Sequence, residues 1–448
     1  MDFKERAAQL QPETAANLAS LVSYPSVANY GEQGTPFGAA NRDCLNKALA
    51  IGAGYGFKTC NLDDYVGYIE YGDGPRTIGI LAHLDVVPVS PTWKTDPFKA
   101  TVIGDRMYGR GTSDDKGGAV CALMAMKILS EMKPDLGDKK IRLILGCNEE
   151  SGSRGIAYYV SKQGYVDMGF TPDADFPLVY GEKGMAGGLI KGHSAKIIDA
   201  KGGTARNAVP ASVTFRLQAD ALDSTKLDRF LTDNKIGYTY TNGKDDAILT
   251  VQGTAAHAAT PELGVNAISY AYEAMYQAGI NDPYVTAYHN LVGLGYNGEM
   301  MGLDLSDKYG RLTCNIGMTF VQDGLLVSTI DIRFPVTMHV ADITAKLQTH
   351  QPWVSDVQGV DPLFFPLDHP MIEALMDAYR QCGPDPDRQP MTMGGGTYAR
   401  AMKNIVAFGC AVRQEPYHIH EDNEFVYLDD LTVQVKVYVQ ALLNLLKL

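Results

Sequence analysis

The sequence predicts an α/β protein: a domain with a mainly parallel sheet flanked by helices is interrupted by an inserted α+β domain with antiparallel sheets. Three observations lead to this prediction. A strand, an Ala-rich helix and a second strand follow one another within residues 78–146, the order of a right-handed βαβ unit. Residues 185–384 contain alternating segments rich in Thr, Val, Gly and Tyr, typical of antiparallel strands. After residue 384 the acidic and Gly-rich stretches return.

Length and composition agree with this division. A chain of 448 residues exceeds one ordinary hydrophobic core, so two or three domains are expected. Its 45% hydrophobic and 20% charged residues are typical of a soluble globular protein. A net charge of -13 argues against nucleic acid or an anionic membrane surface as a partner, because both would repel such a surface.

We expect a cytoplasmic protein. The opening MDFKERAAQLQ lacks the features of a secretory signal, and no run of about 18 apolar residues occurs. The seven cysteines are odd in number, scattered and never in CxxC spacing. They suit buried thiols in a reducing compartment better than disulfides or a thiolate zinc site.

The elements of the first domain can be placed in order. Helical patterns occupy much of residues 12–56, around a Pro/Gly-rich loop. Ile78 to Ala82 is predicted as a buried strand, residues 119–132 as a helix and Ile141 to Gly146 as a second strand, parallel to the first. Ligands of such sheets bind at the carboxyl ends of the strands.

The insertion and the tail complete the order. Strands are predicted at SVTFRLQAD, AILTVQG, RLTCNIGMTF and LLVSTIDIRFPV, and helices at AISYAYEAMYQAG and ITAKLQTHQPWV. An amphipathic helix is predicted from Val426 onward, since Asp429 and Asp430 near its start suit the helix dipole. The predicted domains are residues 1–184 with 385–448, and the insertion 185–384.

Polar residues follow the first predicted strand directly. His83 and Asp85 lie two positions apart on extended backbone, so their side chains face one cleft. A carboxylate that meets the second ring nitrogen of a histidine fixes its tautomer and orientation, as in many metal sites. His83 is therefore a metal-ligand candidate and Asp85 its orienting partner, although a buried polar pair without a metal is the commoner case.

Further acidic residues occur where the same edge of the sheet is expected. Asp114 and Asp115 follow the turn at GRG, and Glu149 and Glu150 follow the second strand. Adjacent glutamates diverge, so one can bind a metal while the other remains free as a base. On its own, such a pair is more often a solvated turn.

Two more stretches offer ligands. Asp173 and Asp175 lie in PDADFP, and His418 and His420 lie in the loop that precedes the last helix. One of these histidines could close a metal site. The residues alone leave open which aspartate and which histidine would take part.

Taken together, HLD, GRGTSDDKG, NEESG, PDAD and HEDNE occur in the order found in the M20 family of metallopeptidases. The resemblance covers nearly the whole chain and is greatest to the PepV-type bacterial dipeptidases of this family. It implies a catalytic domain formed by residues 1–184 and 385–448, and a lid domain formed by residues 185–384.

The resemblance also implies two divalent metal ions. His83 and Asp173 would hold one ion, Glu150 and His420 the other, and Asp114 would bridge both, joined to Asp115 by a cis peptide bond. Motif spacing favours Asp173 over Asp175 and His420 over His418. Two divalent ions against three carboxylates and a bridging hydroxide make the site neutral, as burial requires. Such ligands suit Zn²⁺ foremost, and also Mn²⁺ or Co²⁺.

The implied reaction is hydrolysis of the peptide bond in short unblocked peptides, most of all dipeptides. A metal-bridged water would attack, with Glu149 as general base and proton carrier, and Asp85 behind His83. Lid residues would complete the site: His257, in GTAAHAATPELG, would meet the developing oxyanion, and Asn207 and Arg333 would hold the substrate.

A substrate carboxylate could also bind to backbone N–H groups around Gly395 and Thr397 in MGGGTYAR, although a plain turn explains this stretch equally well. The glycines are not a phosphate-binding loop, because no GK follows them.

Alternatives within the family are an aminoacylase or other N-acyl-amino-acid deacylase, a carboxypeptidase and an N-acyl-diamine deacylase. Such members usually carry Glu in place of Asp173 and a smaller, dimerising lid, whereas the insertion here has about 200 residues. We therefore expect a monomer in which His257 acts within its own chain. A non-catalytic metal-binding relative is the alternative from another class. Such a protein would tend to lose the general base or a metal ligand, and this chain has lost neither.

Overall fold

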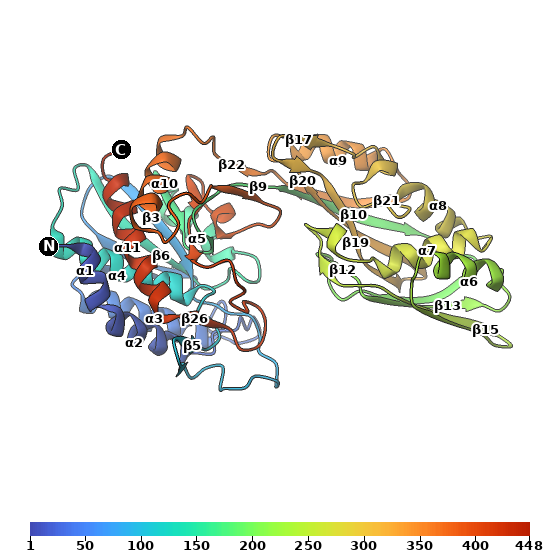
Figure 1. Cartoon of the computed structure of the whole chain (residues 1–448), viewed down its shortest axis with the longest axis horizontal. Coiled ribbons are helices and arrows are strands. Elements are labelled where there is room, and N and C mark those ends of the chain that lie inside the picture. Colours follow the sequence, from blue (N-terminus) through green and yellow to red (C-terminus); the bar gives the residue numbers. More distant parts are fainter. The chain divides into compact units, whose positions relative to one another are not determined.

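The computed structural model describes all 448 residues. The chain forms two compact units, drawn in Figure 1. Unit 1 consists of residues 1–180, 365–391 and 396–448, and unit 2 of residues 181–364 and 392–395.

The helices of unit 1 are α1 (Phe3–Gln9), α2 (Gln11–Val22), α3 (Ala39–Gly54), α4 (Lys116–Met132), α5 (Arg154–Gln163), α10 (Pro370–Cys382), the 3-10 turn η3 (Tyr398–Ala401) and α11 (Leu428–Leu445). Its strands are β1 (Lys58–Leu62), β2 (Val66–Tyr71), β3 (Arg76–His83), β4 (Thr101–Ile103), β5 (Arg106–Tyr108), β6 (Lys139–Gly146), β7 (Met168–Thr171), β8 (Ala174–Asp175), β24 (Ile405–Ala407), β25 (Cys410–Ala411) and β26 (Phe425–Tyr427). Strands β9 (Val179–Glu182) and β23 (Met391–Met393) lie where the chain passes between the units.

The main sheet of unit 1 has the strand order β1-β2-β6-β3-β7-β24. Four consecutive strands, β6, β3, β7 and β24, are parallel: β3 pairs with β6 and β7, and β7 pairs with β24. Strands β1 and β2 are antiparallel additions. The predicted βαβ unit is therefore confirmed, and its parallel register places His83 beside Gly146. The carboxyl ends of β3, β6 and β7 consequently lie at one edge of the sheet.

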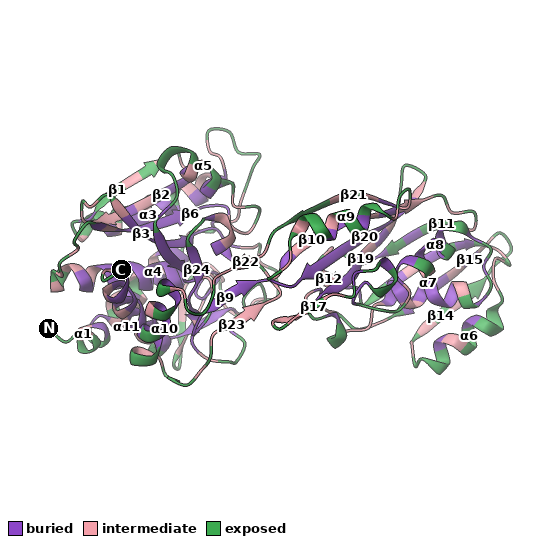
Figure 2. Ribbon diagram, turned by 90° about the horizontal axis from the view of Figure 1, so that it is seen from above, coloured by how far each residue is buried: buried purple, intermediate pink, exposed green.

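Apolar burial explains why these segments form a sheet and its covering helices. Seven of the eight residues of β3 are buried, as expected for a central strand with both faces covered. Helix α4 packs against both β3 and α11, and its Ala-rich sequence allows a close approach. In Figure 2 the central strands are buried. None of the helices combines the length and apolarity needed to cross a lipid bilayer.

The helices of unit 2 are α6 (Ser224–Asp233), α7 (Ala267–Gln277), α8 (Pro283–Leu291), α9 (Val340–Gln348) and the 3-10 turns η1 (Pro261–Leu263) and η2 (Glu299–Met301). Its strands are β10 (Gly184–Gly192), β11 (Ile197–Gly202), β12 (Ala208–Val209), β13 (Ser212–Gln218), β14 (Tyr238–Asn242), β15 (Asp246–Gln252), β16 (Ala256–His257), β17 (Ser306–Asp307), β18 (Gly310–Arg311), β19 (Thr313–Gln322), β20 (Leu325–Phe334), β21 (Val354–Val360) and β22 (Leu363–Phe364).

Unit 2 is built on an eight-stranded sheet with the order β14-β15-β13-β11-β19-β20-β10-β21. Every strand pair in it is antiparallel, as the alternating sequence patterns predicted. Its core contains a group of fully buried aromatic rings, in which Tyr272 stacks on Tyr288 with centroids 4.2 Å apart and lies edge-on to Phe215. The α+β character of the insertion is thus confirmed.

Two boundaries differ from the prediction. The long segment of unit 2 ends at Phe364, not at residue 384, because α10 buries Ile372 and Leu375 and packs against α11 of unit 1. The final helix begins at Leu428, two residues later than predicted, because Val426 belongs to β26 and pairs with Met107 of β5.

Candidate functional site

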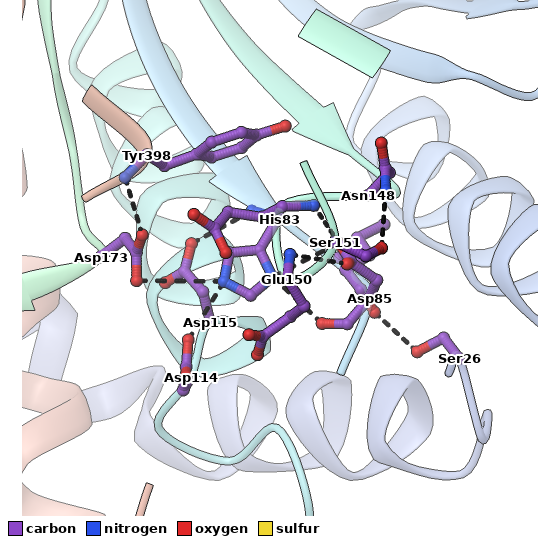
Figure 3. Close-up of polar contacts among 12 residues, drawn as sticks. Ser26, His83, Asp85, Asp114, Asp115, Asn148, Glu150, Ser151, Asp173 and Tyr398 are labelled. Carbon is purple, nitrogen blue, oxygen red and sulfur yellow. Dashed lines mark hydrogen bonds and ion pairs between the residues drawn. The ribbon is translucent and has the colours of Figure 1, made fainter. Parts of the chain in front are cut away.

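His83 lies at the end of β3 with its ring fixed from behind (Figure 3). Its Nδ1 is 3.0 Å from the backbone carbonyl oxygen of Asp85 and 3.5 Å from the Asp85 carboxylate. Nδ1 therefore donates to the Asp85 carbonyl oxygen, and Nε2 is the ring atom that can bind a metal once it has lost its proton. That Nε2 faces Asp114, 3.1 Å from Oδ1.

Asp85 is fully buried and does more than orient His83. Its carboxylate accepts hydrogen bonds from the backbone N–H groups of Glu149, at 2.9 Å, and Glu150, at 3.1 Å. Asp85 therefore fixes the turn that carries both glutamates, a contact that the sequence did not reveal because it involves only the backbone of these residues.

Asp114 lies between two histidines. Its Oδ1 faces His83, and its Oδ2 is 2.9 Å from Nε2 of His420. The peptide bond between Asp114 and Asp115 is cis, as the resemblance implied. With one oxygen toward each histidine, the carboxylate has the arrangement expected of a bridging ligand.

Glu150 and His420 lie on the other side of Asp114 from His83. Glu150 Oε1 is 3.1 Å from Nε2 of His420, although 270 positions separate the two residues. His418, the alternative histidine, is exposed and pairs with Glu421 at 2.9 Å. The geometry therefore places His420 and not His418 beside the carboxylates.

Asp173 lies near His83. Its Oδ1 lies 3.9 Å from His83 Nε2, and its Oδ2 accepts a hydrogen bond of 3.0 Å from the backbone N–H of Tyr398. The Tyr398 ring lies edge-on to His83, with centroids 5.8 Å apart (Figure 3). Asp175 is exposed and is not among the residues that could hold a metal ion.

The five side chains form two overlapping groups, His83–Asp114–Asp173 and Asp114–Glu150–His420. Within each group the potential ligand atoms lie within 4.8 Å of one another. Two atoms that bind one ion at about 2.1 Å are themselves roughly 3 to 3.4 Å apart, so the observed separations suit a shared cation. Imidazole nitrogens and carboxylate oxygens are ligands that Zn²⁺, Mn²⁺ and Co²⁺ accept.

Electrostatics favour positive charge at this position. Hydrogen bonds to Asp114 and Glu150 raise the pKa of His420 to about 10. Burial lowers the pKa of His83, but hydrogen bonds to Asp114 and Asp85 outweigh it and hold that pKa well above its usual value. The carboxylates thus hold protons on both imidazoles where no metal supplies the charge, which is the behaviour expected of a cation site.

Glu149 belongs to neither ligand group, although it is adjacent to Glu150. Burial, with a smaller contribution from the negative charges of Glu150 and Asp85, raises the pKa of its carboxyl to about 7. A carboxylate with a pKa near neutrality can both accept and return a proton at physiological pH.

His257 of unit 2 lies in the short strand β16, opposite Ala208. Its Nδ1 accepts a hydrogen bond of 3.1 Å from the backbone N–H of Ala259. Burial and the nearby charge of Arg333 lower its pKa below the usual value. The ring is therefore neutral at pH 7 and carries its single proton on Nε2, which makes Nε2–H a hydrogen-bond donor.

The remaining predicted residues are positioned differently. Arg333 is buried and already pairs with Asp331, at 2.7 Å and 3.1 Å. Asn207 is exposed, and its carbonyl oxygen accepts from Ala258 beside His257, so Asn207 and His257 are neighbours. Asp331 was missed by the sequence reasoning, although it lies only two positions from Arg333 on the same strand.

Gly395 and Thr397 fall on opposite sides of a unit boundary. Thr397 is buried and caps η3, accepting a hydrogen bond from the Ala399 N–H at 3.2 Å. This capping contact gives the MGGGTYAR stretch a structural reason, and a role in binding the substrate stays a prediction.

Comparison with known proteins identifies the class. Residues 79–444 match the model of peptidase family M20/M25/M40. The chain belongs to this family, and it is therefore a peptidase of a metal-dependent family.

Individual relatives match over nearly the full length. YtjP of Bacillus subtilis (strain 168) is 33% identical over 433 residues, covering 92% of each chain. The beta-Ala-Xaa dipeptidase of Lactobacillus delbrueckii subsp. lactis is 29% identical, covering 100% of this chain and 99% of its own.

Solved structures show the same fold. Human carnosine dipeptidase 1 has a TM-score of 0.58 at 17% identity, covering 99% of both chains. An M20 family metallo-carboxypeptidase of Sulfolobus solfataricus has a TM-score of 0.59 at 18% identity, covering 97% of this chain and 100% of its own.

Proposed function

We propose that this protein hydrolyses the peptide bond of short unblocked peptides, above all dipeptides, with two divalent metal ions. The observation that carries the proposal is the pair of ligand groups that share Asp114. The similarity of this chain, over its full length, to a beta-Ala-Xaa dipeptidase supports the substrate class.

The proposed ligands are His83, Asp114 and Asp173 for one ion and Asp114, Glu150 and His420 for the other. When bound, such ions lower the pKa of water toward neutrality and polarise the scissile carbonyl. We propose Zn²⁺ foremost, with Mn²⁺ and Co²⁺ as alternatives; the nitrogen and oxygen ligands accept all three.

Glu149 would supply the acid–base chemistry. As a non-ligand carboxylate next to Glu150, it would take the proton of the attacking water at a carboxylate oxygen and return it to the leaving amine. Asp85 would keep Glu149 in place, since it holds the backbone N–H of this residue at 2.9 Å.

His257 would donate Nε2–H to the oxyanion that develops on the scissile carbonyl. The backbone N–H of Ala259 fixes the required tautomer. Arg333 and Asn207 would hold the substrate, and unit 2 would act as a lid that closes on it. We propose that the protein works as a monomer, and a tight dimer in sedimentation would contradict this.

The substrate class can be tested with dipeptides, tripeptides and N-acetyl amino acids, each assayed on the metal-loaded enzyme. We expect cleavage confined to unblocked dipeptides. Preferential cleavage of N-acetyl amino acids would instead identify an aminoacylase, and release of single C-terminal residues from longer peptides would identify a carboxypeptidase. The Glu149→Gln variant is the control for a contaminating peptidase.

A further inference from the structure

Glu424 is a fully buried carboxylate that no step of the proposed reaction uses. Its Oε1 accepts hydrogen bonds from the backbone N–H groups of Ser113, at 2.9 Å, and Asp114, at 3.1 Å. Its Oε2 accepts from the backbone N–H of Gly111, at 3.0 Å, and from Arg110 Nη1, at 2.8 Å. One side chain thus binds the backbone of the whole turn that ends at Asp114.

Only a carboxylate satisfies these partners. All four are donors, two on each oxygen, so both oxygens must accept. A glutamine would turn its own NH₂ group toward N–H donors on one side, leaving buried groups unpaired at that position.

The segment that carries Glu424 is held in return. Arg110 Nη2 donates to the carbonyl oxygen of Glu421 at 3.0 Å, and Ser113 Oγ donates to that of Phe425 at 2.7 Å. The backbone N–H of Gly109 donates to the carbonyl oxygen of Glu424 at 3.0 Å. Residues 109–114 and 420–425 are therefore fixed to each other from both sides, although 310 positions separate Glu424 from Asp114.

Each of these two segments carries one member of the second ligand group. Asp114 ends the first segment and His420 begins the other, and Asp114 Oδ2 lies 2.9 Å from His420 Nε2. Glu424 thus accepts a hydrogen bond from the backbone N–H of Asp114, and it lies four positions after His420 in the sequence. Of the first group, only Asp114 lies on either segment, since His83 and Asp173 are held elsewhere.

We propose that Glu424 is a positioning residue that sets the separation of Asp114 and His420, and thereby the affinity for the ion held by Asp114, Glu150 and His420. Arg110 assists from the opposite segment. The inference rests on the proposed two-metal function, and it adds that the two ions depend unequally on one buried carboxylate that touches neither of them.

Three variants separate positioning from general support of the fold. Glu424→Gln removes one acceptor oxygen, and Arg110→Lys keeps the charge but cannot span both Glu424 and Glu421. Asp282→Asn is the matched control: Asp282 is a buried carboxylate in unit 2 that accepts hydrogen bonds from the backbone N–H groups of Ala195, Lys196, Tyr284 and Val285.

The experiment titrates CoCl₂ into each metal-free, full-length protein and follows binding by calorimetry and by the visible absorption of bound Co²⁺. Thermal unfolding of the same samples reports the fold. We expect the wild type to bind two ions. In Glu424→Gln one dissociation constant should rise about 10- to 100-fold, as for other residues that orient metal ligands, and the other should rise less.

Arg110→Lys should shift the same dissociation constant in the same direction by a smaller factor, and it decides the matter if Glu424→Gln does not fold. Asp282→Asn should lower the unfolding temperature and leave both dissociation constants unchanged. The inference is overturned if the Glu424 and Arg110 variants bind Co²⁺ as the wild type does, or if both sites weaken equally in them and in Asp282→Asn. A wild type that binds fewer than two ions overturns the proposed function itself.

Discussion

The candidate residues of the two units differ in how they are held. In unit 1, the histidines and carboxylates contact one another directly, as His420 does Asp114 and Glu150. In unit 2, His257 accepts a hydrogen bond from the backbone N–H of Ala259, and Arg333 forms an ion pair with Asp331. The first set is a concentration of negative charge, and the second is an uncharged donor beside a guanidinium.

This difference indicates a division of labour. Carboxylates that repel one another when ionised are stabilised by positive charge between them, so the cluster in unit 1 suits a bound cation. A neutral imidazole with a fixed N–H donor can stabilise negative charge as it develops, without binding a metal. Removing parts of each set should therefore give different losses.

The largest effect should follow removal of the metals. Dialysis against a chelator should reduce hydrolysis to background, because the carboxylates and histidines of unit 1 have no other means of polarising the substrate. Addition of Zn²⁺, Mn²⁺ or Co²⁺ should restore it, as measured by release of amino acids from a dipeptide. Full activity in a sample shown to be metal-free would contradict the account.

Replacement of Glu149 should rank second. Glu149→Gln should lower kcat by hundreds-fold or more, since the base acts only in the transition state, with bound metal unchanged. Metal content measured beside kcat separates this variant from Glu150→Gln, which should also lose an ion. Wild-type kcat in a metal-loaded Glu149→Gln enzyme would remove the base assignment.

Replacement of His257 should cost about 100-fold in kcat, the usual loss on removing one oxyanion donor. The metal content of His257→Ala should stay at two ions, because this residue belongs to neither ligand group. His193→Ala is the matched control, an exposed histidine of the same unit that matches no motif. Equal losses in both variants would show that His257 has no special role.

Ion binding to the metal-free protein should release protons. The pKa of His420 is raised to about 10, so its ring is protonated at pH 7 and must lose that proton to bind a metal. Apparent affinity should consequently increase about tenfold per pH unit for each proton released. Calorimetry in buffers of different protonation enthalpy measures this release, and its absence would contradict the electrostatic description.

The smallest effect should follow Tyr398→Phe. Tyr398 supports Asp173 through its backbone N–H, and its buried hydroxyl has no hydrogen-bond partner. Loss of an unpaired hydroxyl should change kcat, and the equilibrium constant of unfolding, by no more than about twofold. A large fall in kcat would show that the hydroxyl takes part in the reaction.

Much of the site in unit 1 could be predicted because each side chain follows a recognisable strand or turn. The strand before His83 and the strand before Glu149 are apolar runs, and their parallel register follows from the helix between them. The choice of His420 over His418 came from motif spacing; in the structure His420 lies 3.1 Å from Glu150, and His418 pairs with Glu421.

Other parts could not be predicted from sequence for a physical reason. The contacts of Asp85, Glu424 and Tyr398 involve backbone N–H groups, which every residue except proline carries, so no residue pattern reveals the partner. The boundary at Phe364 was missed because an amphipathic helix such as α10 can cover either domain. The Asp331–Arg333 pair could not be predicted either. Residues two apart on a strand point the same way, but whether they pair depends on which other side chains lie within reach.

The central claim, that five side chains hold two ions with Asp114 between them, is tested most directly by X-ray diffraction from Mn²⁺-loaded crystals with anomalous scattering. The account predicts two anomalous peaks, one beside His83 and Asp173 and one beside Glu150 and His420, each in contact with a different oxygen of Asp114. A single peak, or peaks away from Asp114, would contradict it.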